Sequence, residues 1–275
     1  MLVNGTPQQT ISLNERALAY GDGVFETIRL FEGQPVLLAE HLQRLSLACD
    51  ALDINCDFKK LNTDIQFISE EFDKFGVLKI VLSRGEGGRG YRPDTELEAT
   101  RILTLHSLPV LGDFDANNGI AVFMCRQRLS QQKALAGIKH LNRLEQVLAA
   151  KEWPNERFFE GLMCDVDGDV IEGTRTNLFF SENGSLRTPA LTYAGVNGVL
   201  RQLLLEKMPK ETIIEDKITV ERLLQADELF LCNSVIGVWP VKELVITGLV
   251  TDKSQYFTPG KFSEIAKELF RETLF

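Results

Sequence analysis

Lys139 is the residue whose setting most clearly suggests chemistry. It stands between Ile138 and the pair His140-Leu141, where an extended stretch is expected to give way to a helix. Apolar neighbours that exclude water from a lysine amine lower its pKa from about 10.4, and the neutral amine can then form a Schiff base with a carbonyl group. A lysine near the start of a helix is more often a solvated surface residue, so the spacing alone leaves both interpretations open.

Glu172 is a candidate for a second chemical role. The sequence predicts that it ends a strand and precedes Gly173, whose missing side chain lets the backbone turn close to a ligand. A carboxylate at such a strand end could keep a ring nitrogen protonated, which a cofactor that acts as an electron sink requires. A solvated glutamate in a turn would fit the same spacing.

A glycine-rich stretch before an expected helix offers a place for an anion. Gly195 and Gly198 precede the first turn of this helix. There, the free backbone N–H groups and the positive end of the helix dipole would favour phosphate. An Asn-Gly turn that leads into a purely structural helix is the alternative.

Arginines could bind anions at two further places. Arg44 lies on an expected amphipathic helix, where its planar guanidinium could reach a phosphate or simply remain solvated. The loop over residues 83–92 contains three arginines, among them Arg84 and Arg89, and four glycines. Such a loop could bring mobile cations close to a carboxylate, but a flexible hairpin tip would have the same composition.

The overall composition excludes several classes of function. A net charge of -9 disfavours binding to a nucleic-acid backbone, which needs a basic excess. Five scattered cysteines without a C-x-x-C spacing and only three histidines indicate neither a metal site nor a disulfide framework. No apolar run approaches the roughly 18 residues that span a bilayer, and the first residues do not resemble a signal peptide. We therefore expect a cytoplasmic protein with no metal and no membrane partner.

Mixed strands and helices predict an α+β fold. In the first part of the chain the apolar pattern predicts strands over 24–31, 77–83 and 100–106 and helices over 38–52 and 61–72. We expect a smaller N-terminal α/β domain over residues 1–110, a linker over 111–118, and a larger, β-rich C-terminal domain over 119–275. In this last domain Asp167-Gly168 and Asn183-Gly184 predict hairpins with type I′ turns.

The order of several motifs resembles one known family. The sequence has no G-x-x-x-x-G-K-[ST], no G-x-S-x-G, and no G-x-G-x-x-G with a following acidic residue. It does resemble the fold-type IV, branched-chain-aminotransferase-like pyridoxal-phosphate enzymes over nearly its whole length. The resemblance rests on Gly21–Glu26, His41–Leu45, Lys139, Glu172–Phe179 and Gly195–Val199, in that order.

Within this family the closest likeness is to a lyase branch. Residues 135–146 and 83–91 carry this likeness. Branched-chain aminotransferases typically have a glycine where this chain has Thr27, and a Gly-Thr pair where it has Asn233-Ser234. The lyase branch converts 4-amino-4-deoxychorismate to 4-aminobenzoate and pyruvate in folate biosynthesis, and the resemblance implies this activity.

The resemblance also implies an architecture and a set of site residues. Two α/β domains would form a pyridoxal 5'-phosphate-dependent fold of type IV with the cofactor in the cleft between them, usually in a homodimer. Lys139 would be the Schiff-base lysine and proton shuttle, and Glu172 the partner of the pyridine nitrogen. Arg44, Gly198, Val199, Leu200 and Ser234 would hold the phosphate. The dianionic substrate would contact Thr27, Arg29, Arg84, Arg89 and Asn233.

Two alternatives remain open at this stage. The first is an aminotransferase on the same scaffold, specific for D-amino acids or for branched-chain amino acids. The second is a non-catalytic homologue, retained as a binding or regulatory subunit. The presence of both Lys139 and Glu172 speaks against the second alternative.

Overall fold

The structure of the protein is a computed structural model that describes residues 1–70, 75–87, 89–94, 97–109, 118–208, 213–247 and 253–275. By their internal contacts the residues group into two compact units. The first unit comprises Met1–Val110 together with Ile138–Asn142, and the second comprises Leu111–Gly137 with Arg143–Phe275. The segment that carries Lys139 therefore belongs to the first unit, although it lies within the range predicted for the larger domain. The predicted linker, 111–118, lies outside the described residues except for Asn118, so it stays a prediction.

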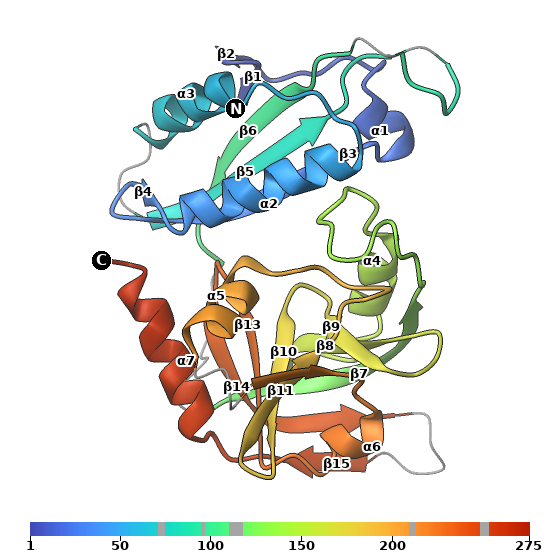
Figure 1. Cartoon of the computed structure of the whole chain (residues 1–275), viewed down its shortest axis with the longest axis vertical. Coiled ribbons are helices and arrows are strands. Elements are labelled where there is room, and N and C mark those ends of the chain that lie inside the picture. The colour runs from blue at the N-terminus through green and yellow to red at the C-terminus, as the bar shows by residue number, and fades with distance from the viewer. Residues whose placement is uncertain (71–74, 88, 95–96, 110–117, 209–212, 248–252) are drawn as a thin grey trace. The chain divides into compact units, whose positions relative to one another are not determined.

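The first unit is built on a six-stranded antiparallel sheet with the strand order β2-β1-β6-β5-β3-β4. Helices α2 and α3 pack on one face of this sheet, and the short helix α1 contacts β5 (Figure 1). The elements are β1 (Leu2–Val3), β2 (Thr6–Pro7), α1 (Arg16–Tyr20), β3 (Gly23–Phe31), β4 (Gln34–Pro35), α2 (Leu38–Ala51), α3 (Phe58–Ser69), β5 (Phe75–Ser83) and β6 (Thr100–His106).

The alternation of side chains along β3 separates the core of the first unit from its other face. Val24, Ile28 and Leu30 are buried in one cluster with apolar residues of α2 and α3. Because successive side chains of a strand point to opposite faces, Phe25, Thr27 and Arg29 point away from these helices. Those residues are only partly buried, which leaves them available for contact with a ligand.

The second unit contains a nine-stranded sheet with the order β12-β11-β10-β13-β14-β7-β8-β9, in which β15 also pairs with β14. Strand β7 is parallel to both β8 and β14, and β11 is parallel to β12, whereas the other pairs are antiparallel. The strands are β7 (Ile120–Leu129), β8 (Phe158–Asp165), β9 (Val170–Gly173), β10 (Asn177–Glu182), β11 (Ser185–Pro189), β12 (Ile213–Asp216), β13 (Glu228–Asn233), β14 (Gly237–Ile246) and β15 (Lys253–Tyr256).

In the described part of the chain, four helices accompany this sheet. Helix α4 packs on β7 and β8, while α5 contacts β13 and α7 (Figure 1). Large apolar side chains such as Phe180 and Trp239 form the core cluster of the unit. None of the helices in the described part of the chain is long and apolar enough to cross a membrane. The helices are α4 (Leu144–Ala150), α5 (Val199–Lys207), α6 (Val220–Leu223) and α7 (Lys261–Glu272).

Of the two predicted type I′ turns, one is confirmed and one is wrong. Asn183 and Gly184 join β10 to β11 with φ values of 53° and 76°, as this turn type requires. Between β8 and β9 only Gly168 has a positive φ, of 91°. There the Asp165 carboxylate accepts hydrogen bonds from the backbone N–H groups of Asp167 and Asp169, at 3.1 and 3.0 Å. This side chain stabilises a longer connection in place of the tight turn.

Candidate functional site

The backbone around Lys139 is hydrogen-bonded to the start of β3. The N–H of Phe25 donates to the carbonyl of Lys139, and the N–H of Leu141 donates to the carbonyl of Gly23, both at 3.0 Å. A side-chain carbon at Gly23 would lie 2.4 Å from the carbonyl oxygen of Leu82 and 2.8 Å from Cδ1 of Leu141, so only glycine fits this approach. These two hydrogen bonds, with an isolated antiparallel bridge between Val24 and His140, hold the backbone of Lys139 beside β3.

The side chain of Lys139 lies over an aromatic ring on the face of β3 that points away from α2 and α3. Its Nζ is 4.3 Å from the centre of the Phe25 ring. Phe25, Thr27 and Arg29 alternate along β3 and are all partly buried on the face that points away from α2 and α3. The structure thus brings Lys139 into contact with Phe25 and places the predicted substrate residues Thr27 and Arg29 on the same face as Phe25.

Lys79 is a cation on this face that the sequence reasoning missed. The register of the sheet pairs it with Thr27, and its Nζ lies 5.7 Å from the centre of the Phe25 ring. Burial lowers the pKa of Arg29 on the same face. Lys79 interrupts an otherwise apolar strand, a signal that could have drawn attention to it, but only the pairing of β3 with β5 shows which residues it faces. Two cations on one sheet face could bind an anionic group.

Arg44 projects from α2 and is bonded to a carboxylate of β3. Its Nε donates to Oε1 of Glu26 at 2.7 Å, and one terminal nitrogen donates to Oε2 at 2.5 Å. Nδ1 of His41 lies 2.7 Å from the same Oε2. Burial would raise the pKa of Glu26, but the charge of Arg44 and the hydrogen bonds from His41 and Arg44 outweigh it and hold the pKa at about 2. The carboxylate is therefore ionised, and it fixes the plane of the guanidinium.

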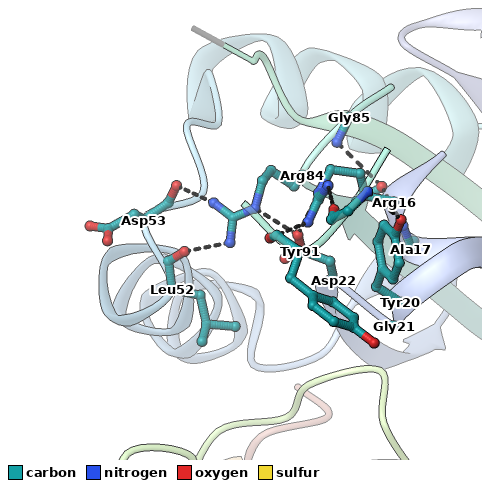
Figure 2. Close-up of polar contacts among 12 residues, drawn as sticks. Arg16, Ala17, Tyr20, Gly21, Asp22, Leu52, Asp53, Arg84, Gly85 and Tyr91 are labelled. Carbon is teal, nitrogen blue, oxygen red and sulfur yellow. Dashed lines mark hydrogen bonds and ion pairs between the residues drawn. The ribbon is translucent and has the colours of Figure 1, made fainter. Parts of the chain in front are cut away.

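Arg84 occupies a position that differs from the one expected of a mobile anion ligand. As Figure 2 shows, its Nε and that of Arg16 both donate to Oδ2 of Asp22 at 2.8 Å. Its terminal nitrogens donate to the carbonyls of Leu52 and Asp53, both at 2.7 Å, just beyond the end of α2. These contacts engage the guanidinium within the protein and do not support the prediction that Arg84 binds a substrate carboxylate.

Arg16 binds the far end of the arginine-rich loop, at Gly90 and Tyr91. Its two terminal nitrogens donate to the carbonyls of Gly90 and Tyr91 at 3.1 and 2.9 Å (Figure 2). The ring of Tyr91 meets that of Tyr20 edge to face, with 5.6 Å between their centres. Arg89 is exposed on this loop, and its predicted role in substrate binding stays a prediction.

Glu172 in the second unit is buried, with 4% of its surface exposed. Its Oε2 accepts a hydrogen bond from the backbone N–H of Val196 at 2.7 Å, and its Oε1 accepts one from Nε2 of Gln146 at 3.4 Å. A side-chain carbon at Gly195 would lie 2.8 Å from both Ile171 and Leu191, so the glycine permits this close packing. Gln146 is a neighbour that the sequence reasoning did not single out.

The strand end that carries Glu172 is itself fixed by a second buried carboxylate. Glu160 accepts hydrogen bonds from the backbone and the hydroxyl of Thr174 and from the hydroxyl of Thr176. Burial raises the pKa of Glu160, although the hydrogen bond from Thr174 opposes this effect. A side-chain carbon at Gly173 would lie 2.2 Å from Oγ1 of Thr176, so the glycine is needed for this packing.

Helix α5 is preceded by a glycine, which has no side chain. The N-cap residue is Gly198, and a side-chain carbon there would lie 2.0 Å from Oδ1 of Asn177. Nδ2 of Asn177 in turn donates to the carbonyl of Val196 at 2.9 Å, next to the contact of Val196 with Glu172. Val199 and Leu200 form the buried first turn, so their N–H groups stand where a helix favours an anion.

Of the predicted residues, Asn233 ends β13, and Ser234 lies in the turn that leads to β14. Oδ1 of Asn233 accepts hydrogen bonds from the N–H groups of Val235 and Ile236, both at 2.9 Å, and its Nδ2 donates to the carbonyl of Arg175 at 3.0 Å. The side chain of Asn233 thus shapes the turn. Ser234 is buried, with 7% of its surface exposed.

The chain is similar to several known proteins. A family model described as "Amino-transferase class IV" matches residues 23–244. An aminodeoxychorismate lyase of Vibrio harveyi is 36% identical over 241 residues, covering 87% of this chain and 89% of the relative. The crystal structure of a 4-amino-4-deoxychorismate lyase from Pseudomonas aeruginosa has a TM-score of 0.92 and 38% identity, covering 98% of each chain. A branched-chain aminotransferase from Thermoproteus uzoniensis has the same fold, with a TM-score of 0.82, 19% identity, and coverage of 97% of this chain and 90% of its own.

Proposed function

The chain belongs to the class IV aminotransferase family, and from this premise we propose that it is a lyase that converts 4-amino-4-deoxychorismate to 4-aminobenzoate and pyruvate. One observation carries the proposal, namely the similarity along nearly the whole chain to two proteins that bear the name of this lyase. Thr27 and the pair Asn233-Ser234, which differ from the pattern typical of branched-chain aminotransferases, agree with it.

The residues present fit pyridoxal 5'-phosphate as the cofactor. The cofactor carries an aldehyde, a pyridine nitrogen and a phosphate, which call for an amine, a buried carboxylate and an anion site. Lys139 supplies the amine, and Glu172 supplies the carboxylate. Gly198 supplies an N-cap without a side chain in front of α5, where any larger residue would collide with Asn177.

The protein residues have defined tasks in this reaction. When bound, pyridoxal phosphate supplies an electron sink for the negative charge that develops next to the amino group of the substrate. Lys139 removes the proton at C4 of the substrate and returns it to the departing enolpyruvyl group, which leaves as pyruvate. Glu172 keeps the pyridine nitrogen protonated. The N–H groups of Val196 and Gln146 stabilise the negative charge of the Glu172 carboxylate.

A product assay tests the proposal. The purified protein, loaded with pyridoxal phosphate, should show an absorption band at about 410 to 430 nm, as a lysine-bound cofactor does. Adding 4-amino-4-deoxychorismate should release 4-aminobenzoate and pyruvate in equal amounts. Amino transfer from D-alanine or leucine to 2-oxoglutarate without these products would identify an aminotransferase instead. A protein that binds no cofactor would be the non-catalytic homologue.

We propose that Arg29 of β3 and Lys79 of β5, on the sheet face that points away from α2 and α3, bind a carboxylate of the dianionic substrate. Changing Arg29 or Lys79 to glutamine should raise KM about 10- to 100-fold, because a hydrogen bond to a charged group contributes about 1.5 to 3 kcal/mol. The effect on kcat should be smaller, since neither side chain is assigned to proton transfer. Steady-state kinetics of 4-aminobenzoate formation measures both constants.

The matched control for these variants is Lys60→Gln. Lys60 is an exposed lysine of α3 in the same unit, and its Nζ lies 3.8 Å from Asp57. This variant should leave KM unchanged. An unchanged KM in the Arg29 and Lys79 variants as well would remove this face from the substrate site.

A homodimer is part of the proposal and is supported by one surface of the second unit. Leu144, Val147 and Leu148 of α4 are exposed to 76%, 48% and 50%. Three apolar side chains on a single helix are typical of a surface that another chain covers. The net charge of -9 disfavours a nucleic-acid partner. A cytoplasmic location without a membrane partner stays a prediction from the sequence.

A further inference from the structure

A buried carboxylate stands behind the arginine proposed to bind the cofactor phosphate. Glu26 has 1% of its surface exposed, and its two oxygens together receive two hydrogen bonds from Arg44 and one from His41. Its side chain lies on the face of β3 covered by α2, together with Val24 and Ile28. Glu26 therefore lies on the opposite face from Phe25, which contacts Lys139.

His41 completes the arrangement from the side away from solvent. Its ring is fully buried, and among the residues that the structure describes its Nε2 has no hydrogen-bond partner. A proton on Nε2 would be buried without an acceptor, which is costly, whereas a proton on Nδ1 has the carboxylate of Glu26 at 2.7 Å. The ring thus donates from Nδ1 and holds Glu26 in place.

The two hydrogen bonds from Arg44 to Glu26 fix the orientation of the guanidinium as well as its distance. A long arginine side chain has many rotamers, and a two-point contact with a planar carboxylate selects one orientation of the guanidinium plane. The contact with Glu26 leaves 15% of the surface of the Arg44 side chain exposed. An anion that meets this surface would find an arginine that is already oriented.

We infer that Glu26 is a positioning residue, which orients Arg44 for the phosphate of the cofactor and is itself held by His41. The inference rests on the proposed function, since it assumes that Arg44 binds this phosphate. Glu26 also neutralises part of the charge of Arg44. If this electrostatic effect dominated, removing the carboxylate would strengthen phosphate binding. If orientation dominates, removal weakens binding.

The test compares two ligands that differ only in the phosphate. The cofactor-free protein is titrated with pyridoxal phosphate and with pyridoxal, and absorbance reports binding. In Glu26→Gln, which keeps the size of the side chain and removes its charge, affinity for pyridoxal phosphate should fall about tenfold, the effect expected for one hydrogen bond to a charged group. Affinity for pyridoxal should stay within about twofold, which also shows that the variant is folded.

A second variant and a second background make the result specific. Glu26→Asp keeps the charge but withdraws the carboxylate by one methylene, and it should also weaken binding of pyridoxal phosphate. In a protein that already carries Arg44→Ala, Glu26→Gln should have no further effect, because Glu26 would act only through Arg44.

The possible failures are distinguishable. Tighter binding of pyridoxal phosphate by Glu26→Gln, with Glu26→Asp unchanged, would overturn the inference in favour of charge neutralisation. Equal losses for pyridoxal and pyridoxal phosphate would overturn it in favour of a general effect on the fold. Normal phosphate-dependent binding by Arg44→Ala would remove its premise. A wild-type protein that binds neither ligand would instead contradict the proposed function.

Discussion

Lys139→Ala should lower the rate of 4-aminobenzoate formation at least about a thousandfold. General acid–base catalysis alone contributes roughly 10² to 10⁴-fold, and this variant also loses the amine that carries the cofactor. The rate is measured by the appearance of 4-aminobenzoate under saturating pyridoxal phosphate. In parallel, borohydride treatment of the wild-type protein followed by peptide mapping should attach the cofactor to Lys139.

Lys133→Ala is the control for this variant. Lys133 is exposed and lies in the same stretch of chain, so its loss should change neither the rate nor the mapped position. Full activity of Lys139→Ala would refute the assignment of the reactive amine. A cofactor mapped to Lys79, the other lysine near Phe25, would move the chemistry to the neighbouring strand.

Glu172→Gln should lower kcat by about a hundredfold or more while it changes the affinity for pyridoxal phosphate less than tenfold. The glutamine keeps the shape of the side chain but loses the charge that keeps the pyridine nitrogen protonated, and losing one preorganised electrostatic contact costs roughly 10² to 10³ in kcat. The amine of Lys139 and the anion site at α5 remain, so binding persists. Single-turnover kinetics and a cofactor titration separate the two quantities.

Glu156→Gln provides the comparison, because Glu156 is an exposed glutamate of the same unit. It should match the wild type in both measurements. If Glu172→Gln lost cofactor affinity and kcat in equal proportion, Glu172 would be a general binding residue. Retained kcat would contradict its role at the pyridine nitrogen.

The sequence predicted local elements of the fold well where the pattern is regular. The strand predicted over 100–106 has these bounds in β6, and the helix predicted over 38–52 ends one residue earlier in α2. Both have a clear apolar period. The turn at Asp167-Gly168 was mispredicted because the carboxylate of Asp165 supplies hydrogen bonds that a dipeptide rule does not include.

The sequence singles out candidate site residues one by one, but it does not predict their contacts. The motifs identify Lys139, Glu172 and Arg44, whereas the register that pairs Thr27 with Lys79 follows from strand pairing, which the sequence specifies only indirectly. Arg84 is a second example of contacts that the sequence did not predict. A loop rich in glycine and arginine suggested a mobile cation, yet long-range contacts with Asp22 and the end of α2 engage this side chain.

The pairing of Ile138–Asn142 with β3 has a consequence for any attempt to divide the chain. A fragment that stops near residue 110 would contain β3 but not the segment that pairs with it. The N–H of Phe25 and the carbonyl of Gly23 would then lose their partners, and the fragment would expose a sheet edge of the kind that recruits other chains and aggregates. A fragment that represents the first unit should therefore include residues 138–142, because a cut at a single point removes the segment that is hydrogen-bonded to β3.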